Sequence, residues 1–345
     1  MKRYVTAIAI IAGLAAVSCT KNDRSQGDLK ASLEKSVADI NNAISVISAT
    51  SGFEMLAASS GTMKSETDFM DSINLNMISG VYDFKPDPFH YRSFFIPYRL
   101  FRKTGESEHM IVNMPEKLVF RPRYLRNLNP PDSLLKNNFT IDASDYHYYY
   151  TWFNKFDYLL SASFLIDSVD VGSLDVVSSG NRETGRSYNS TYTFTEGYNI
   201  NTSFMSGDSS VSSFALSDNE NDLLKETVIR VRKEHHMRER LYILTLGNVE
   251  IRRGTGLDSI QVYLNGVLQQ TAGAKIIDST GDGGSICHHR DILLTFDDGT
   301  TENLSSLLQP ARDVLKTLVD SMHSMRFASD IVDYIAIGIY YHSRE

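Results

Sequence analysis

Aromatic residues are crowded between Phe89 and Tyr158, and this segment contains a run that begins at Tyr146 and ends at Phe153. Successive side chains of a β-strand point to opposite faces, so a strand here places four rings on one face. These four candidate ligand-binding residues are Tyr146, Tyr148, Tyr150 and Trp152. Flat rings with polar tips offer a large contact area at little entropy cost, which suits sugar rings and apolar ligands. Because such residues also fill the inner faces of sheets, plain packing is the alternative.

Residue types that ligate metals occur in two clusters, Cys287-His288-His289 and His235-His236. On regular strand backbone, adjacent residues point to opposite faces, so neither cluster can hold one ion, and the sequence contains no His-Glu-x-x-His or Cys-x-x-Cys. It also contains no Gly-x-Ser-x-Gly and no glycine-rich phosphate loop. We therefore expect no metal and no cofactor. A hydrolase remains open, because catalytic carboxylate pairs form in space and not in sequence.

The N-terminus has the features of an export signal. Lys2 and Arg3 precede an apolar run, Val5 to Val17, which as a helix would span about 20 Å against roughly 30 Å of hydrocarbon. The run ends in Ala16-Val17-Ser18-Cys19, which resembles the lipobox of bacterial lipoproteins, although these families prefer Leu at the position of Ala16. The resemblance implies that residues 1–18 are removed and that Cys19 becomes the acylated first residue. Thr20 in place of Asp implies sorting to the outer membrane.

The charge balance limits the partners of the mature protein. The chain has 34 basic and 42 acidic side chains, a net charge of -8, and loses Lys2 and Arg3 with the signal. Such a surface repels nucleic acid phosphates and anionic head groups, so we expect no nucleic acid partner and attachment to the membrane only through the lipid. If Cys19 is acylated, Cys287 has no partner for a disulfide.

Two amphipathic helices bracket the folded body, which follows a polar tether over residues 19–27. Apolar residues recur at helical spacing after Asp28, at Leu29, Leu33, Val37, Ile40, Ile44 and Ile47. The same spacing recurs near the C-terminus, at Leu304, Leu308, Ala311, Leu315, Leu318, Met322 and Met325. Pro310 lies early enough in this second helix to be tolerated.

Between these helices the apolar pattern alternates with period 2, and turn signals recur about every ten residues. Hairpins are expected at Thr104-Gly105-Glu106, at Glu196-Gly197 and at Asn265-Gly266, and the last strand is expected over Ile331 to Tyr341. The fold class is therefore α+β, with about ten mostly antiparallel strands in a curved meander packed against long N- and C-terminal helices. Residues 28–345 form one body, or divide at Pro130-Pro131 into 28–130 and 131–345.

These features favour a lipid-anchored outer-membrane protein that acts as a non-enzymatic binding or interaction module for an apolar ligand or an envelope glycan. A curved sheet closed by helices is similar in shape to periplasmic lipid carriers. Two alternatives remain open, an envelope glycan or peptide hydrolase and an accessory subunit of an outer-membrane complex that uses the strand Ile331 to Tyr341 as an edge. The sequence does not decide the oligomeric state or whether the protein faces the periplasm or the cell surface.

Overall fold

A computed structural model describes residues 28–58, 72–85, 101–116, 136–151, 155–181, 183–219, 221–232, 238–255, 260–279, 289–321 and 325–342. Cys19 with the whole export signal, Trp152, Cys287 and the pair His235-His236 lie outside these ranges. Within the ranges, the helices are too short or too polar to cross a membrane.

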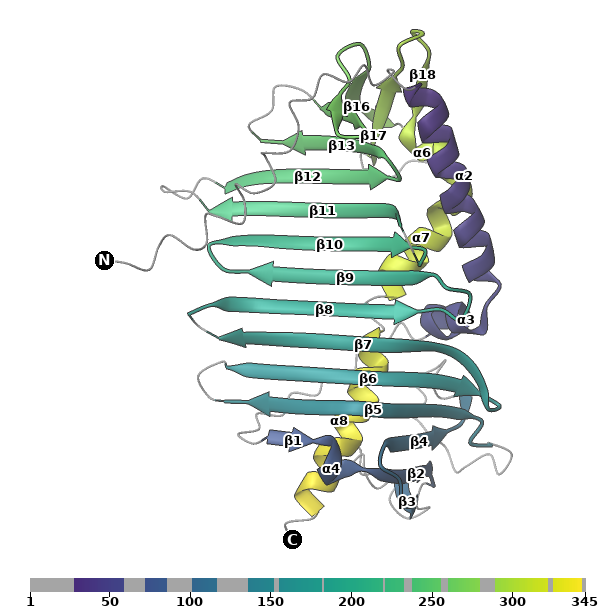
Figure 1. The fold of residues 1–345 in the computed structure, drawn as a ribbon, viewed down its shortest axis with the longest axis vertical. Coiled ribbons are helices and arrows are strands. Elements are labelled where there is room, and N and C mark those ends of the chain that lie inside the picture. The colour runs from purple at the N-terminus through teal and green to yellow at the C-terminus, as the bar shows by residue number, and fades with distance from the viewer. Residues whose placement is uncertain are drawn as a thin grey trace.

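One sheet of 15 strands forms the body of the molecule (Figure 1). Its strands are β1 Ser72–Asn74, β2 Gly80–Phe84, β3 Phe101–Gly105, β4 Met110–Met114, β5 Phe139–Tyr150, β6 Phe156–Ile166, β7 Val169–Asn181, β8 Gly185–Thr193, β9 Asn199–Ser206, β10 Ser209–Ser217, β11 Asp222–Arg232, β12 Arg238–Leu246, β13 Val249–Gly254, β14 Gln261–Leu264 and β15 Val267–Leu268. Every strand from β5 to β14 pairs with the next one along the chain, so the expected antiparallel meander is confirmed. The expected strand number of about ten is too low, in part because the turns at Asp167-Ser168 and Gly247-Asn248 each divide one long apolar segment into two strands.

Local turn chemistry sets the register of the meander. Asn265 and Gly266 have φ values of 52° and 77°, as a two-residue hairpin turn of type I′ requires, and they join β14 to β15. Gly197, with φ 85°, lies in the turn between β8 and β9. Both expected hairpins are thus confirmed. The turn between β6 and β7 has positive φ at Asp167 and Ser168, two residues without the usual glycine signal.

The expected hairpin around Thr104-Gly105-Glu106 is wrong. β3 and β4 lie on either side of this segment, but β2 is inserted between them, antiparallel to β3 and parallel to β4. The parallel pairing joins residues about 30 apart in sequence, such as Val81 and Ile111, and local turn signals carry no information about such a partner. Since β4 also pairs with β5, the described segments on both sides of residue 130 share one sheet.

The helices are shorter than expected. They are α2 Leu29–Ser48, α3 Ser51–Ala58, α4 Leu75–Ile78, α6 Leu304–Leu307, α7 Gln309–Ser321 and α8 Met325–His342. The side chain of Asp28 caps α2 by accepting hydrogen bonds from the backbone N–H groups of Lys30 and Ala31, and the apolar stripe of α2 is buried. The C-terminal apolar pattern does not form one helix, because Leu308 ends α6 and Pro310 occupies the second position of α7.

The segment Ile331 to Tyr341, expected to be an edge strand, is part of α8. Val332, Ile335, Ala336 and Tyr340 are its buried apolar residues, and their spacing places them on one helix face. The hydroxyl of the buried Tyr146 on β5 donates a 2.9 Å hydrogen bond to Asp333. Packing against the sheet therefore selects the helix, although a β-branched run of this length is also typical of a strand. The segment that the accessory-subunit hypothesis uses as an edge strand is therefore helical.

A second, smaller sheet lies beside the β13 end of the first (Figure 1). It contains β16 Gly273–Ser279, β17 His289–Thr295 and β18 Thr301–Asn303. An isolated bridge between Ile260 and Ala274 connects the two sheets. Leu294 and Phe296 from this small sheet join the same buried core as the α2 stripe and the large sheet.

Candidate functional site

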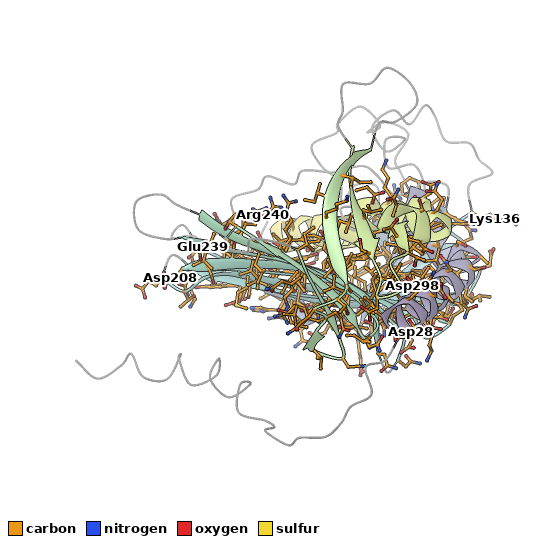
Figure 2. The ribbon with its side chains drawn as sticks, turned by 90° about the horizontal axis from the view of Figure 1, so that it is seen from above. Asp28, Lys136, Asp208, Glu239, Arg240 and Asp298 are labelled. Carbon is orange, nitrogen blue, oxygen red and sulfur yellow. The ribbon has the colours of Figure 1, made fainter. Side chains whose placement is uncertain are left out.

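The helices leave much of the large sheet uncovered. α2 and α3 lie beside one set of strand ends, and α7 and α8 lie to one side of the sheet (Figures 1 and 2). Asp208, Glu239 and Arg240 mark strand ends that extend beyond the helices in Figure 2. We call the face that carries Tyr146 and Leu244 the covered face, and the opposite face, with Val177 (51% exposed) and Met205 (61% exposed), the open face.

Cross-strand pairing arranges the residues of the covered face in parallel rows, since paired residues of a sheet point to the same side, and three adjacent rows lead to the candidate site. The first row is the core row, with Tyr146, Leu160, Val176, Ser190, Thr202, Phe214, Glu226, Leu244, Ile251 and Val262. The second, the aromatic row, contains Tyr148, Tyr158, Ser178, Tyr188, Phe204, Ser212, Val228, Tyr242 and Arg253. The third, the arginine row, contains Tyr150, Phe156, Gly180, Arg186, Ser206, Ser210, Arg230 and Arg240.

Three of the four candidate tyrosine and tryptophan residues fall on this face, each in a different row. Tyr146 is 1% exposed and belongs to the core, so its ring is not available to a ligand in this structure. Tyr148 is half-buried and stacks edge-on against Tyr158, with ring centroids 6.3 Å apart. Tyr150 is half-buried at the strand end. Trp152 lies outside the described residues.

At the far end of the aromatic row, the two sheets enclose a pocket of about 490 Å³. Three isoleucines supply apolar walls, Ile251 from β13 and Ile276 and Ile292 from the small sheet. The polar lining includes the phenol of Tyr242, the hydroxyl of Thr255 and the guanidinium groups of Arg240 and Arg253. The pocket thus combines apolar isoleucine walls with two cations and two hydroxyls.

Two titratable groups of this region have pKa values shifted by burial. Burial raises the pKa of the Glu226 carboxyl from its ordinary value, while the positive charge of Arg240 opposes the rise. Burial, assisted by the negative charge of Glu226, raises the pKa of Tyr242 to about 12. Tyr242 therefore carries its proton at neutral pH and can donate a hydrogen bond to an anion.

Asp291 also lines the pocket, but its carboxylate has structural partners. One oxygen accepts hydrogen bonds from the backbone N–H groups of Ile292 (2.8 Å) and Ser305 (3.2 Å), and the other accepts from the Ser305 hydroxyl. Asp291 therefore anchors the start of α6 to β17.

The chain matches no family model, no curated protein and no solved structure. What the site can bind therefore follows from its own side chains. An apolar pocket with a few convergent polar groups is the usual form of a small-molecule site, and its volume falls within the common range of about 300–1,000 Å³.

A second, more open cleft of about 1180 Å³ lies between α2 and the turns at the near ends of the strands. Its walls are polar, with Lys35, Asp39 and Asn42 from α2 facing Asn221 and Tyr198 from the sheet. Asp222, at its rim, accepts hydrogen bonds from Ser217 and Lys225, and these outweigh the effect of burial and lower the pKa of its carboxyl. Amides, carboxylates and one aromatic ring suit a neutral polar ligand.

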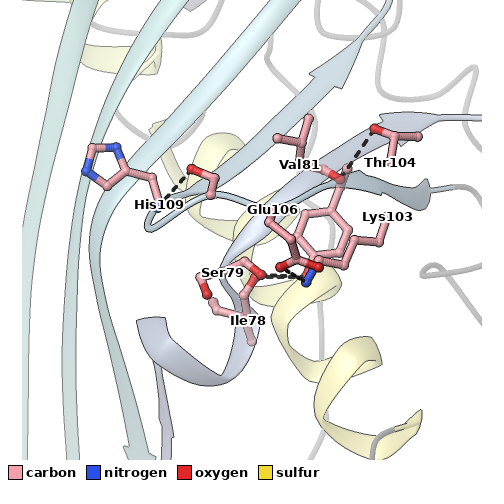
Figure 3. A network of polar contacts seen from close by, with 9 residues as sticks. Ile78, Ser79, Val81, Lys103, Thr104, Glu106 and His109 are labelled. Carbon is pink, nitrogen blue, oxygen red and sulfur yellow. Dashed lines mark hydrogen bonds and ion pairs between the residues drawn. The ribbon is translucent and has the colours of Figure 1, made fainter.

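A third group of polar side chains surrounds the β2–β3–β4 edge (Figure 3). The hydroxyl of Tyr82 donates to the carbonyl of Ile78 (2.9 Å), and Lys103 forms a 2.7 Å ion pair with Glu106. The first contact joins β2 to α4 and the second joins β3 to the turn that follows it, so both stabilise the edge.

His109, beside this edge, is the described histidine whose surroundings come nearest to a catalytic one. Its Nδ1 lies 2.8 Å from Asp142, but the Ser107 hydroxyl accepts a hydrogen bond from the backbone N–H of His109 and not from its ring, which points away (Figure 3). Within the described ranges, no three of His, Cys, Asp and Glu come close enough to hold a metal.

The sequence alone did not identify these pocket and row residues as candidates for ligand binding: Arg230, Arg240, Tyr242 and Arg253. A signal was present, because Arg240, Tyr242 and Leu244 alternate along one strand, as do Glu226, Val228 and Arg230 along its neighbour. Alternation predicts that each set shares a face. It does not reveal that both sets share the same face, since that depends on the register of pairing.

Proposed function

We propose that this chain is a lipid-anchored protein of the outer membrane, held there by Cys19, that binds an apolar or amphipathic molecule without chemically changing it. The binding site is the pocket between β12–β13 and the small sheet, together with the aromatic row that leads to it.

The observation that carries this proposal is the composition of the pocket. Ile251, Ile276 and Ile292 meet there from two different sheets and form the apolar walls of a pocket of about 490 Å³. Interiors of proteins are normally packed without such voids, and space of this kind is favourable to an apolar ligand that leaves water.

The aromatic row extends this apolar surface beyond the pocket. Tyr188, Val228 and Tyr242 are half-buried, and Phe204 is 39% exposed, although all lie on the face that packs against the helices. Adjacent strands are about 4.8 Å apart, so the four-strand distance from Tyr188 to Tyr242 is roughly 19 Å. A long apolar chain can lie across these strands with its end in the pocket.

The test uses the mature chain with Cys19→Ser, purified without detergent and measured by native mass spectrometry before and after organic extraction. We expect an adduct that extraction removes, and binding of the apolar dye 1-N-phenylnaphthylamine by the extracted protein. Tyr242→Ala together with Ile251→Ala should weaken dye binding. Tyr263→Ala, on the open face of β14, is the control. An unliganded mass combined with no dye binding contradicts the proposal.

The polar cleft beside α2 favours a second candidate, binding of an envelope glycan. Asp39 and Asn42 are exposed on α2, and Tyr198 offers a ring across the cleft, a combination that suits sugar hydroxyls and ring faces. Saturation-transfer NMR with purified muropeptides tests it. Signal that is lost in Asp39→Ala and Asn42→Ala but kept in Glu34→Ala, on the same helix outside the cleft, supports this candidate, and equal signal in all three excludes it.

A further inference from the structure

We propose that the ligand of the pocket carries an acidic head group, a carboxylate or a phosphate, that Arg240 and Arg253 bind while Arg230 and Arg186 attract it. This inference rests on the proposed function, because it defines the chemical class of ligand for the same site.

The arrangement of the arginines is unfavourable without an anion. Arg230 on β11 and Arg240 on β12 are direct cross-strand partners, and Arg253 lies one strand further along, opposite Tyr242. Like charges placed opposite each other in a sheet destabilise it. The chain as a whole is acidic, with a net charge of -8, so this positive patch is a local exception to its surface.

Among the described residues, the nearby acidic groups do not balance the positive charge of the patch. Four arginines lie in the aromatic and arginine rows, and the single acidic residue in all three rows is Glu226. Glu226 lies in the core row between Phe214 and Leu244, and one carboxylate there cannot balance four guanidinium groups. The carboxylate of Asp291, which lines the pocket, already accepts hydrogen bonds from Ile292 and from Ser305 at the start of α6. Positive charge therefore remains available to a ligand.

The position of the cations matches the polar end of an amphipathic molecule. Arg240 and Arg253 are exposed at the mouth of the pocket, whereas Ile251, Ile276 and Ile292 form its walls. The planar guanidinium fork binds carboxylates and phosphates with two parallel hydrogen bonds, and Tyr242 can supply a further donor. A head group held here leaves its apolar chain on the three isoleucines or along the aromatic row.

The test compares amphiphiles of one chain length in the mature Cys19→Ser chain. The affinities of lauric acid, lauryl phosphate and lauryl alcohol are measured by displacement of 1-N-phenylnaphthylamine. The three proteins compared are the wild type, the double variant Arg240→Gln/Arg253→Gln and the single variant Arg252→Gln. Arg252 is a matched control, because it precedes Arg253, points to the open face and pairs there with Glu250. Circular dichroism and thermal melting check that each variant folds.

We expect the wild type to prefer at least one acidic amphiphile over the alcohol by about tenfold or more, the size of one charge-assisted hydrogen bond. The double variant should lose this preference and keep its affinity for the alcohol, whereas Arg252→Gln should behave like the wild type. The acid with the higher affinity identifies the source of the ligand. Tighter binding of lauric acid indicates a free fatty acid, and tighter binding of lauryl phosphate indicates a phospholipid head group.

Equal affinity of the wild type for the acids and the alcohol overturns this inference and leaves the proposed function standing. A preference that survives in a folded double variant also overturns it. If the dye does not bind and the purified protein carries no adduct, the proposed function itself fails. The wild-type comparison needs no variant, so misfolding of the double variant does not prevent a decision.

Discussion

Arg230 and Arg240 lie directly opposite each other on adjacent strands, at a point where the sheet extends past its helices. Two positive side chains in this position repel each other, and nothing in the local fold requires them, because either could be a neutral strand residue. In the account proposed above, this pair contributes to binding an anion at some expense of stability.

Replacing Arg230 by Thr should therefore stabilise the unliganded protein. We expect the free energy of unfolding to rise by about 0.2–1 kcal/mol in urea at low salt, since one like-charge pair is removed. At 1 M salt, where the Debye length is about 3 Å, the gain should disappear. Arg252→Thr, which removes the partly buried ion pair with Glu250 on the open face, should give no gain, and an equal gain in both variants would refute the explanation.

Glu226 should make stability depend on pH in a direction opposite to that of most carboxylates. Its folded pKa is raised above the ordinary value of 4.5, so between these two values the native state binds more protons than the unfolded state. The free energy of unfolding therefore falls as pH rises through this window and is highest below it.

Glu226→Gln should flatten this pH dependence, because the amide does not titrate. In Arg240→Gln the free energy of unfolding should continue to fall up to a higher pH, because the variant lacks the positive charge that opposes the rise of the Glu226 pKa. Urea unfolding at a series of pH values from about 4 to 8 measures both effects, because this range covers the pH values at which a carboxyl group with a raised pKa titrates. An unchanged slope in Glu226→Gln would exclude Glu226 as its origin.

The hydroxyl of Tyr146 should contribute to the stability of the folded protein. Tyr146→Phe removes the 2.9 Å hydrogen bond to Asp333 and leaves that carboxylate without this donor, so we expect a loss of about 1.5–3 kcal/mol in urea unfolding. Tyr149→Phe, on the other face of the same strand, is the control and should change stability by less than about 0.5 kcal/mol. A near-zero effect of Tyr146→Phe would mean that β5 and α8 are not joined by this contact.

The contact of α3 with β7 depends on a glycine. A Cβ atom at Gly52 would lie 2.5 Å from the carbonyl oxygen of Val171 and 2.9 Å from the hydroxyl of Tyr192. Gly52→Ala should cost about 1–3 kcal/mol through overpacking, although alanine is favoured in helices. At Gly207 the nearest atom would be 3.8 Å away, so Gly207→Ala should cost much less. Equal effects would show that α3 can move away from β7.

Local signals in the sequence predicted the parts of this fold that depend on neighbouring residues. The alternation of apolar residues and the dipeptides Asn265-Gly266 and Glu196-Gly197 predicted hairpins, and each of these joins strands that are consecutive in the chain. The α2 stripe from Leu29 to Ile47 predicted a buried helix face for the same reason.

Features that depend on distant partners were not predicted. The insertion of β2 between β3 and β4 is a parallel pairing with no local turn. The helical state of Ile331 to Tyr341 is decided by burial against the sheet and by Tyr146, since its composition suits a strand equally well. The pocket combines Tyr242, Arg253 and Ile276 from strands in two sheets, so its residues converge only after both have formed.

The central claim is that an acidic amphiphile binds between β12–β13 and the small sheet, and photo-cross-linking tests it most directly. A fatty acid that carries a diazirine on its chain is irradiated with the mature Cys19→Ser protein, and labelled peptides are mapped by mass spectrometry. We predict labels within residues 240–255 and 273–279 that excess lauric acid suppresses. Labels confined to the open face or to the α2 cleft, or labelling that lauric acid does not reduce, would contradict the claim.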